Sequence, residues 1–214
     1  MSTAKGNALG ALRIRRPLRG ALVAVVAIIL ALVTGCSSSG ATHSAASTTT
    51  AAASASGVKT AAAISRSTPV SFDIASIKAS GSLIAVGLNA DGSVQVPSDY
   101  LQAGWYQQGP APGEQGSAVI LGHVDSYKGT GVFFYLKKVK PGDMIDVKRA
   151  DGKTAHFKVT DVRMYLKSQF PDQLVFGPRG GATLQVVTCG GQFDQAAKSY
   201  ESNVVVFSSL DSVT

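Results

Sequence analysis

The stretch Thr183-Leu-Gln-Val-Val-Thr-Cys189-Gly-Gly191 combines a run of strand-forming residues with a cysteine and two glycines at its end. Aliphatic and β-branched residues in a short run predict a β-strand. The sequence holds one other cysteine, Cys36, which ends an apolar N-terminal stretch. Because cysteines of exported proteins are normally paired, an unpaired Cys189 is either a buried strand residue or a nucleophile.

The N-terminus has the order of an export signal. The basic segment Arg13-Ile-Arg-Arg16 precedes the apolar run Ala21–Val33, which is short for a membrane span of roughly 20 residues. The run ends in Val33-Thr-Gly-Cys36, which resembles a bacterial lipobox, so Cys36 is the predicted lipidation site. Residues 1–36 are therefore predicted to be a signal peptide or membrane anchor, with an uncleaved signal anchor or simple secretion as alternatives. Each alternative places the rest of the chain on the extracytoplasmic side of the membrane.

The next segment and the charge balance exclude several classes of protein. Residues 37–68 are predicted to be a disordered tether, because Ala, Ser and Thr dominate and no apolar periodicity is present. Five of the chain's 20 basic residues lie in residues 1–36, which leaves 15 basic residues against 13 acidic ones. This near balance does not support nucleic-acid binding, which needs a basic face. The sequence has no acidic cluster and no Cys/His set with the spacing of metal ligands, so neither a metal nor another cofactor is expected.

Residues 69–214 are predicted to form the folded domain, in which short apolar runs alternate with Gly, Pro and Asp. The segment Lys148–Thr154, with Asp151-Gly152 at its tip, predicts a hairpin. The run Ala155–Tyr165 alternates and then changes phase, which predicts a bulge near Thr160 and Asp161. Many short strands without a long helical period favour a mainly β fold, a closed or nearly closed barrel with few helices. The predicted strands are Leu83–Leu88, Ala118–Leu121, Met144–Val147, Ala155–Tyr165, Thr183–Thr188 and Val204–Phe207.

A histidine follows one of these strands just as the cysteine follows another. In Val119-Ile-Leu-Gly-His123-Val-Asp125, His123 comes directly after an apolar run and a glycine. Strand ends of a barrel open onto one rim, so His123 and Cys189 can meet although they are 66 positions apart. An imidazole can take the thiol proton and later protonate a leaving amine. On its own this pair is weak support for catalysis, because a buried cysteine that ends a core strand is the commoner case.

The residues around both candidates resemble those of the sortases, cysteine transpeptidases of Gram-positive bacteria. The matching motifs are Gly122-His-Val-Asp-Ser126 and Thr183-Leu-Gln-Val-Val-Thr-Cys-Gly-Gly191. Other segments resemble the actinobacterial class F subtype, which is sometimes grouped near class E. They include Gly104-Trp-Tyr106, Pro112-Gly-Glu114, Lys140-Pro-Gly-Asp143 and Tyr200-Glu-Ser-Asn-Val-Val-Val206. The resemblance runs from about Phe72 to Ser208.

The resemblance implies a sortase-type barrel of about eight strands with transpeptidase or peptidase activity, in the hydrolase class. Cys189 would attack a sorting signal such as Leu-Pro-x-Thr-Gly on a surface protein, and the resulting thioacyl-enzyme would be resolved by an amine such as a cell-wall precursor. His123 would act as general acid and then base, and the backbone N–H of Gly190 would be an oxyanion donor. Thr188 would position the substrate or simply pack in its strand. Asp125 would orient His123 or face solvent.

One feature departs from the family. Sortases supply an arginine shortly after the cysteine, and this chain has no arginine between Cys189 and Thr214. Lys198 is the one cation in that segment and is the expected replacement, although lysine lacks the planar fork of arginine. Arg179 is the alternative. The missing arginine leaves open a second function, that of a surface-tethered peptide-binding protein on a degenerate, weakly active or inactive sortase barrel. A different Cys–His acyltransferase of the envelope, such as an L,D-transpeptidase, fits the Thr-Cys-Gly-Gly context less well.

Overall fold

The computed structural model describes residues 61–214, which form strands and short helical turns. The predicted anchor of residues 1–36, with Cys36, and the tether up to residue 60 lie outside the described residues. Within residues 61–214, no helix is both long enough and apolar enough to cross a membrane. The strands are β1 (Pro69–Ile74), β2 (Ala79–Val86), β3 (Ala103–Tyr106), β4 (Gly116–Gly122), β5 (Asp125–Ser126), β6 (Gly129–Thr130), β7 (Met144–Arg149), β8 (Thr154–Leu166), β9 (Ala182–Asp194) and β10 (Ser199–Val213). The helical elements are η1 (Ala75–Ile77), η2 (Leu136–Lys138), η3 (Lys167–Gln169) and α1 (Asp172–Phe176).

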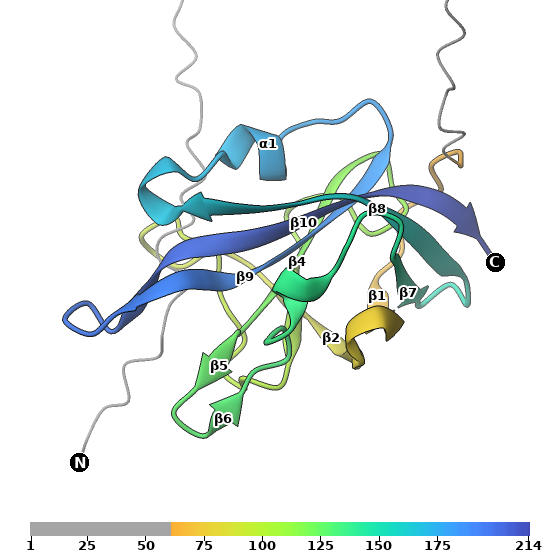
Figure 1. Ribbon diagram of the computed structural model, residues 1–214. Helices are drawn as coiled ribbons and strands as arrows, with labels where there is room; N and C mark the ends of the chain where they lie inside the picture. Colours follow the sequence, from red (N-terminus) through yellow and green to blue (C-terminus); the bar gives the residue numbers. More distant parts are fainter. Residues whose placement is uncertain (1–60) are drawn as a thin grey trace, which may run out of the picture. The chain divides into compact units, whose positions relative to one another are not determined.

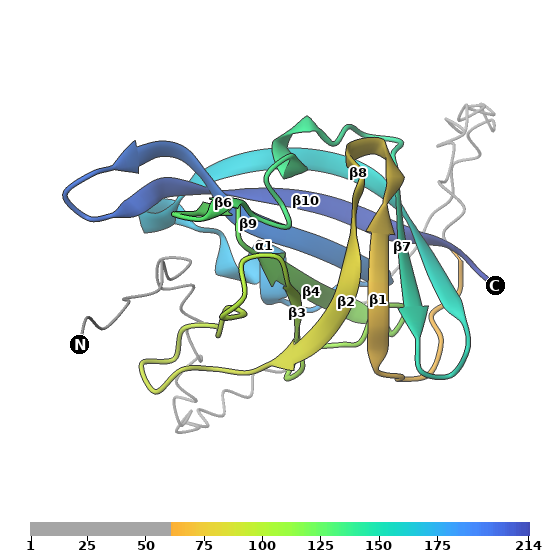
Figure 2. The same ribbon diagram turned by 90° about the horizontal axis from the view of Figure 1, so that it is seen from below.

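Eight strands close into a barrel in the order β1-β2-β3-β4-β9-β10-β8-β7, with β7 pairing back onto β1 (Figure 1). Neighbours are antiparallel except β2 with β3 and β4 with β9, which are parallel. The predicted mainly β fold, a closed eight-stranded barrel with short helices, is therefore confirmed. Figures 1 and 2 show the β9–β10 hairpin extending beyond the barrel, at the end where β5 and β6 form a small separate sheet.

Two local predictions about β8 are confirmed. β7 and β8 form a hairpin whose turn contains Gly152, with a φ of 81° that favours glycine. Further along β8, Phe207 of β10 pairs with Asp161, whereas Ser208 pairs with Val159. Thr160 is therefore the extra residue of a bulge, and the phase change in the sequence marks the place where β8 changes the face that it presents.

Alternate residues of β9 belong to two different apolar clusters. Val186 packs in the interior cluster, which takes side chains from strands all around the barrel. Val187 and Cys189 belong to a second cluster on the outer face of the sheet, to which α1 contributes Val175. Because side chains of a strand alternate between faces, Cys189 lies on the outer face, where the segment between β8 and β9 covers it.

Residues 61–68, here called the strap, contact the barrel rather than continue the tether. Arg66 forms an ion pair with Glu114 at 2.9 Å. The guanidinium of Arg149, a buried residue of β7, donates a hydrogen bond to the carbonyl of Ser65 at 2.6 Å. Residues 61–68, which the sequence analysis grouped with the tether, therefore make specific contacts with the barrel. The composition of the strap gave no sign of these contacts, because most of them are hydrogen bonds and an ion pair made by two arginines, Arg66 and Arg149, and not the burial of large apolar side chains.

Candidate active site

Cys189 lies on β9 and is 8% exposed. The next residue, Gly190, packs so closely on β10 that an added Cβ would lie 2.7 Å from Cγ2 of Val204. Gly191 has a φ of 80°, which strains any other residue, and the pairing of β9 with β10 shifts beside it. The two glycines therefore allow β9 to pack closely on β10 and to bulge directly after the thiol, an irregularity of the kind that is frequent beside active sites.

His123 follows β4, the strand beside β9. In this parallel pair Leu121 lies opposite Val187, an offset of 66 positions that also separates His123 from Cys189. Residues at equal offset in a parallel pair lie side by side, and both strands carry these side chains on the same face. The pairing extends as far as Leu121 and Val187, and His123 and Cys189 follow those residues at the same end of neighbouring strands.

The imidazole of His123 is held by another backbone group. Its Nε2 lies 2.8 Å from the carbonyl oxygen of Pro97. Because a carbonyl can only accept, Nε2 carries the proton, and the neutral ring has Nδ1 free to accept one. Within residues 61–214 the ring makes no hydrogen bond to Cys189. The resting imidazole is thus beside the thiol's strand but is oriented by Pro97.

Two more of the predicted site residues join strand ends. The hydroxyl of Thr188 donates a hydrogen bond to the carbonyl of Gly122 at 2.8 Å, which ties the end of β9 to the end of β4. Asp125 accepts a hydrogen bond from the phenol of Tyr200. Burial and the hydrogen bond with Asp125 raise the pKa of Tyr200 to about 12. Among the described contacts, Asp125 therefore joins β5 to β10 and does not orient His123.

The surroundings of the thiol favour its neutral form. Burial is the largest effect and raises the pKa of Cys189, and the negative charge of Asp125 raises it further. The positive charge of Lys167 and a hydrogen bond from it lower the pKa, but the balance stays above the ordinary value. The resting thiol is therefore protonated at neutral pH, and a nucleophilic role requires a base at the moment of attack.

Lys167 is a site residue that the sequence analysis missed. It begins η3 directly after β8, and its Nζ donates a hydrogen bond to Oγ of Ser199 at 2.8 Å. The family pattern places the cation after the cysteine, whereas Lys167 precedes Cys189 by 22 positions. The signal that could have found it is strand pairing, because β8 ends beside β10, where Leu166 lies opposite Ser202.

The two cations expected from the sequence lie elsewhere. Lys198 is exposed in the turn between β9 and β10, where its φ is 50°. Arg179 donates a hydrogen bond to the backbone carbonyl of Leu174 in α1. Neither is among the groups of residues 61–214 that shift the pKa of Cys189.

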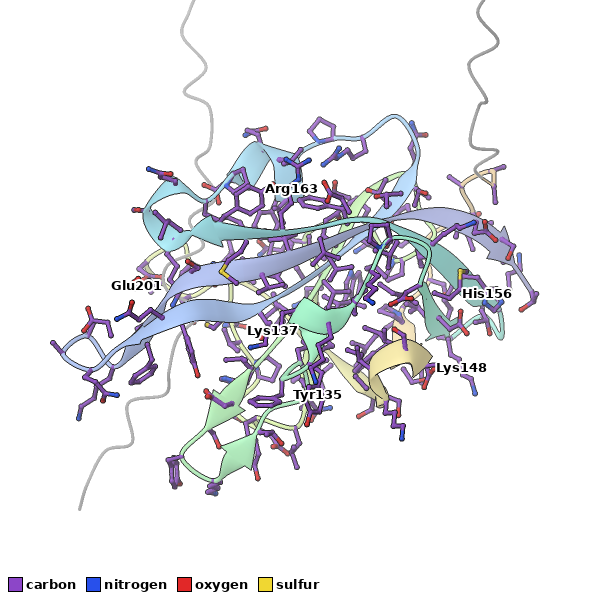
Figure 3. The ribbon with its side chains drawn as sticks, in the orientation of Figure 1. Tyr135, Lys137, Lys148, His156, Arg163 and Glu201 are labelled. Atoms are coloured by element: carbon purple, nitrogen blue, oxygen red, sulfur yellow. The ribbon has the colours of Figure 1, made fainter. Side chains whose placement is uncertain are left out.

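A cavity of about 320 Å³ opens beside Cys189. Val124, Phe133 and Met164 give it largely apolar walls. Lys137 supplies a charge at its edge and projects from η2 (Figure 3). This volume lies at the small end of the range of ligand pockets, about 300–1,000 Å³. Cys189 therefore lines a space suited to an apolar part of a ligand rather than to a whole polypeptide.

The second histidine of the domain is remote from this site. Figure 3 shows His156 at the opposite end of the barrel from Glu201, which lies on β10 near the β9–β10 hairpin. His156 is hydrogen-bonded to Asp146 at 2.7 Å and to Thr214 at 2.9 Å. No group of three or more His, Cys, Asp or Glu side chains within residues 61–214 is arranged to hold a metal ion.

The sequence pattern of the sortase domain matches residues 74–211, well over half of the chain. The chain belongs to the sortase family. Membership supports a transpeptidase of the sortase kind in general terms, and it favours this family over the L,D-transpeptidases. Comparison of the chain with curated protein sequences gave no match.

Solved sortase structures share this barrel. Sortase A from Corynebacterium diphtheriae superposes with a TM-score of 0.50 at 19% identity, over 68% of this chain and 61% of that one. A sortase from Actinomyces oris gives a TM-score of 0.51 at 18% identity, over 71% of this chain and 84% of that one. Sortase C1 from Streptococcus agalactiae, solved with MTSET, gives 0.51 at 18% identity, over 66% and 67%. At these identities the likeness concerns the fold.

Proposed function

We propose that this sortase is a cysteine transpeptidase of the cell envelope, of the class F type, with Cys189 as nucleophile. The observation that carries the proposal is the parallel pairing of β4 and β9, whose ends lead to His123 and Cys189, together with the cavity that Cys189 lines. The substrate is a surface protein with a sorting signal similar to Leu-Pro-x-Thr-Gly. The acceptor is an amine, such as that of a cell-wall precursor.

The proposed reaction begins from a protonated thiol. When the substrate binds, the Cys189 proton passes to the free nitrogen of His123, and Sγ attacks the carbonyl carbon of the scissile amide. The carbonyl oxygen becomes an oxyanion, for which the backbone N–H of Gly190 is one donor. His123 then gives its proton to the leaving amine, and a thioester remains on Cys189. An incoming amine attacks that thioester and gives its proton to His123; the C–S bond then breaks, the new amide leaves, and Sγ takes the proton back from His123.

We assign the positive charge beside the nucleophile to Lys167. Its charge lowers the pKa of Cys189, and its hydrogen bond to Ser199 fixes the ammonium on β10. Lys198 and Arg179, which the sequence pointed to, remain the less favoured candidates because one is exposed and the other binds α1. A lysine supplies charge but not the bidentate geometry of arginine.

The proposed location follows from the N-terminal sequence. Either the apolar run Ala21–Val33 or a lipid on Cys36 would hold the chain at the extracytoplasmic face of the membrane. The mass of the protein extracted from membranes tests the lipid. A diacylglyceryl adduct on Cys36 supports a lipoprotein, whereas an intact N-terminus supports a signal anchor.

Peptide cleavage by the purified full-length chain tests the function. A fluorogenic Leu-Pro-x-Thr-Gly-like peptide is offered with and without an amine acceptor, to the wild type and to Cys189→Ala, His123→Ala and His156→Ala. We expect no product from the first variant, and a loss of at least about 10²-fold from the second, in which the acid–base group is gone. His156→Ala is the matched control at the far end of the barrel and keeps wild-type turnover. Turnover by Cys189→Ala would rule out the proposed nucleophile.

A binding protein on an inactive barrel is the second candidate, because burial raises the pKa of the thiol. Iodoacetamide labelling separates the two. An enzyme is labelled on Cys189 and cleaves peptides, whereas a binding protein retains the peptide uncleaved and its cysteine stays unlabelled.

A further inference from the structure

Asn203 of β10 is a buried amide without a hydrogen-bond partner. It is 0% exposed, and neither Nδ2 nor Oδ1 has a hydrogen-bond partner within residues 61–214. Buried polar side chains of native proteins are nearly always hydrogen-bonded, because burying an unsatisfied amide destabilises the fold. A residue that lowers stability in this way calls for an explanation, and its position suggests one.

Asn203 lies directly across from the thiol. It is the register partner of Cys189 in the antiparallel pair of β9 and β10. Side chains of such partners project from the same face of the sheet, with their Cβ atoms about 4.5–5.5 Å apart. Val187 and Val205 pack in the same outer cluster, and Tyr165 lies opposite Asn203 on the other side, on β8. The amide therefore faces Sγ from one side in a largely apolar setting.

Three charged or ionisable side chains near the thiol already have partners, whereas the buried hydroxyl of Tyr165, opposite Asn203 on β8, has none within residues 61–214. Lys167 and Asp125 are each hydrogen-bonded to a residue of β10, and His123 is bonded to the carbonyl of Pro97. Asn203 differs from these residues because its donor is unused in the resting protein. A donor that lies opposite the nucleophile in the sheet, and is unpaired in the resting protein, is placed to stabilise charge formed only during reaction.

We propose that Nδ2 of Asn203 donates a hydrogen bond to the acyl oxygen of the group that is bonded to Cys189. This proposal rests on Cys189 being the acylated residue, as proposed above. When Sγ bonds to the carbonyl carbon, the electron pair of the C=O bond moves to oxygen, and that oxyanion accepts the Asn203 N–H. When the amine leaves with a proton from His123, the C=O bond reforms. A neutral amide gives this stabilisation without adding a second positive charge beside Lys167.

The test compares two reactions of the same thiol. Acylation of Cys189 by p-nitrophenyl acetate passes through an oxyanion, whereas alkylation by iodoacetamide displaces iodide and forms none. Asn203→Leu removes the amide at similar volume in the full-length chain. The matched control is Gln185→Leu, which removes another buried amide from the same face of β9, opposite Phe207 rather than beside the thiol. Melting temperature and peptide cleavage are measured for each variant.

We expect Asn203→Leu to slow acylation by about 10²–10³-fold, the usual effect of removing one oxyanion donor. Alkylation should stay within about threefold of the wild-type rate, since the thiol itself is unchanged. The melting temperature should equal or exceed that of the wild type, because two unpaired buried atoms are gone. Gln185→Leu should leave the ratio of acylation to alkylation unchanged.

Two results would overturn the proposal. One is an Asn203→Leu chain that is acylated at the wild-type rate. The other is a fall in the acylation rate, the alkylation rate and the melting temperature together, in both Asn203→Leu and Asn203→Ala. That result would mean that the amide supports the fold rather than the oxyanion. Failure of the proposed function looks different, because the wild type would then be acylated by the ester yet would not cleave the peptide.

Discussion

Gly190→Ala tests how closely the nucleophile's strand is packed. The added Cβ would lie 2.7 Å from Cγ2 of Val204 and 3.7 Å from Cε of Met164. Ordinary contact begins at 3.4 Å, so the structure must absorb a displacement of 0.7 Å. Met164 is flexible, whereas Val204 is a buried β-branched residue with little rotamer freedom, so the backbone next to Cys189 must move.

Overpacking of this kind costs about 1–3 kcal/mol of unfolding free energy. For a chain of this size the melting temperature should fall by roughly 2–12 °C. The substitution keeps the backbone N–H at position 190, so it moves the backbone beside Cys189 without removing the proposed oxyanion donor. A displacement of this size at the reacting atom should slow peptide cleavage by roughly 10- to 100-fold.

Calorimetry and the cleavage assay measure both effects, and Gly180→Ala is the control. A methyl group added at Gly180 would have no described atom within 4 Å, and the residue has no positive φ, so the change there should stay within about 0.5 kcal/mol. If Gly190→Ala has the same melting temperature and the same peptide-cleavage rate as Gly180→Ala, the close packing beside the nucleophile is refuted.

Three further predictions concern charge and the strap. Lys167→Ala should raise the pKa of Cys189 and move the pH profile of iodoacetamide alkylation to higher pH, whereas Lys198→Ala should leave the profile in place. An unchanged profile in both would exclude Lys167 as the charge beside the thiol. Asp125→Asn removes a negative charge, so the same profile should move to lower pH; a shift upward would contradict this. Arg149→Met should lower the melting temperature and speed proteolysis within the strap, because the buried guanidinium of Arg149 binds the carbonyl of Ser65 in the strap. Proteolysis at the wild-type rate would show that other contacts hold the strap.

The sequence was sufficient for the barrel and for part of the site. Period-two alternation in Ala155–Tyr165 predicted β8, and the change of phase predicted the bulge at Thr160. The placement of His123 and Cys189 after two apolar runs pointed to one rim, and the runs that precede them, β4 and β9, are parallel neighbours in the barrel. Local sequence patterns were informative for these features because strand alternation and turn conformation depend on residues that are adjacent in the sequence.

Contacts between distant segments cannot be predicted in this way. Lys167 reaches the thiol because β8 ends beside β10, a pairing that no local pattern reveals. Asn203 looks like an ordinary polar residue at the start of an apolar strand, and only the register shows that it faces Cys189. The strap has the composition of a tether because its contacts are hydrogen bonds to carbonyls rather than an apolar stripe.

The most direct test of a Cys189 nucleophile is the mass of the acyl-enzyme. The full-length chain is mixed with a Leu-Pro-x-Thr-Gly-like peptide without an acceptor amine, quenched in acid, digested and analysed by mass spectrometry. We predict that the Leu-Pro-x-Thr acyl group is added to the fragment that contains Cys189 and is released by an amine nucleophile. An acyl group on any other residue, or cleavage by Cys189→Ala, would contradict the assignment.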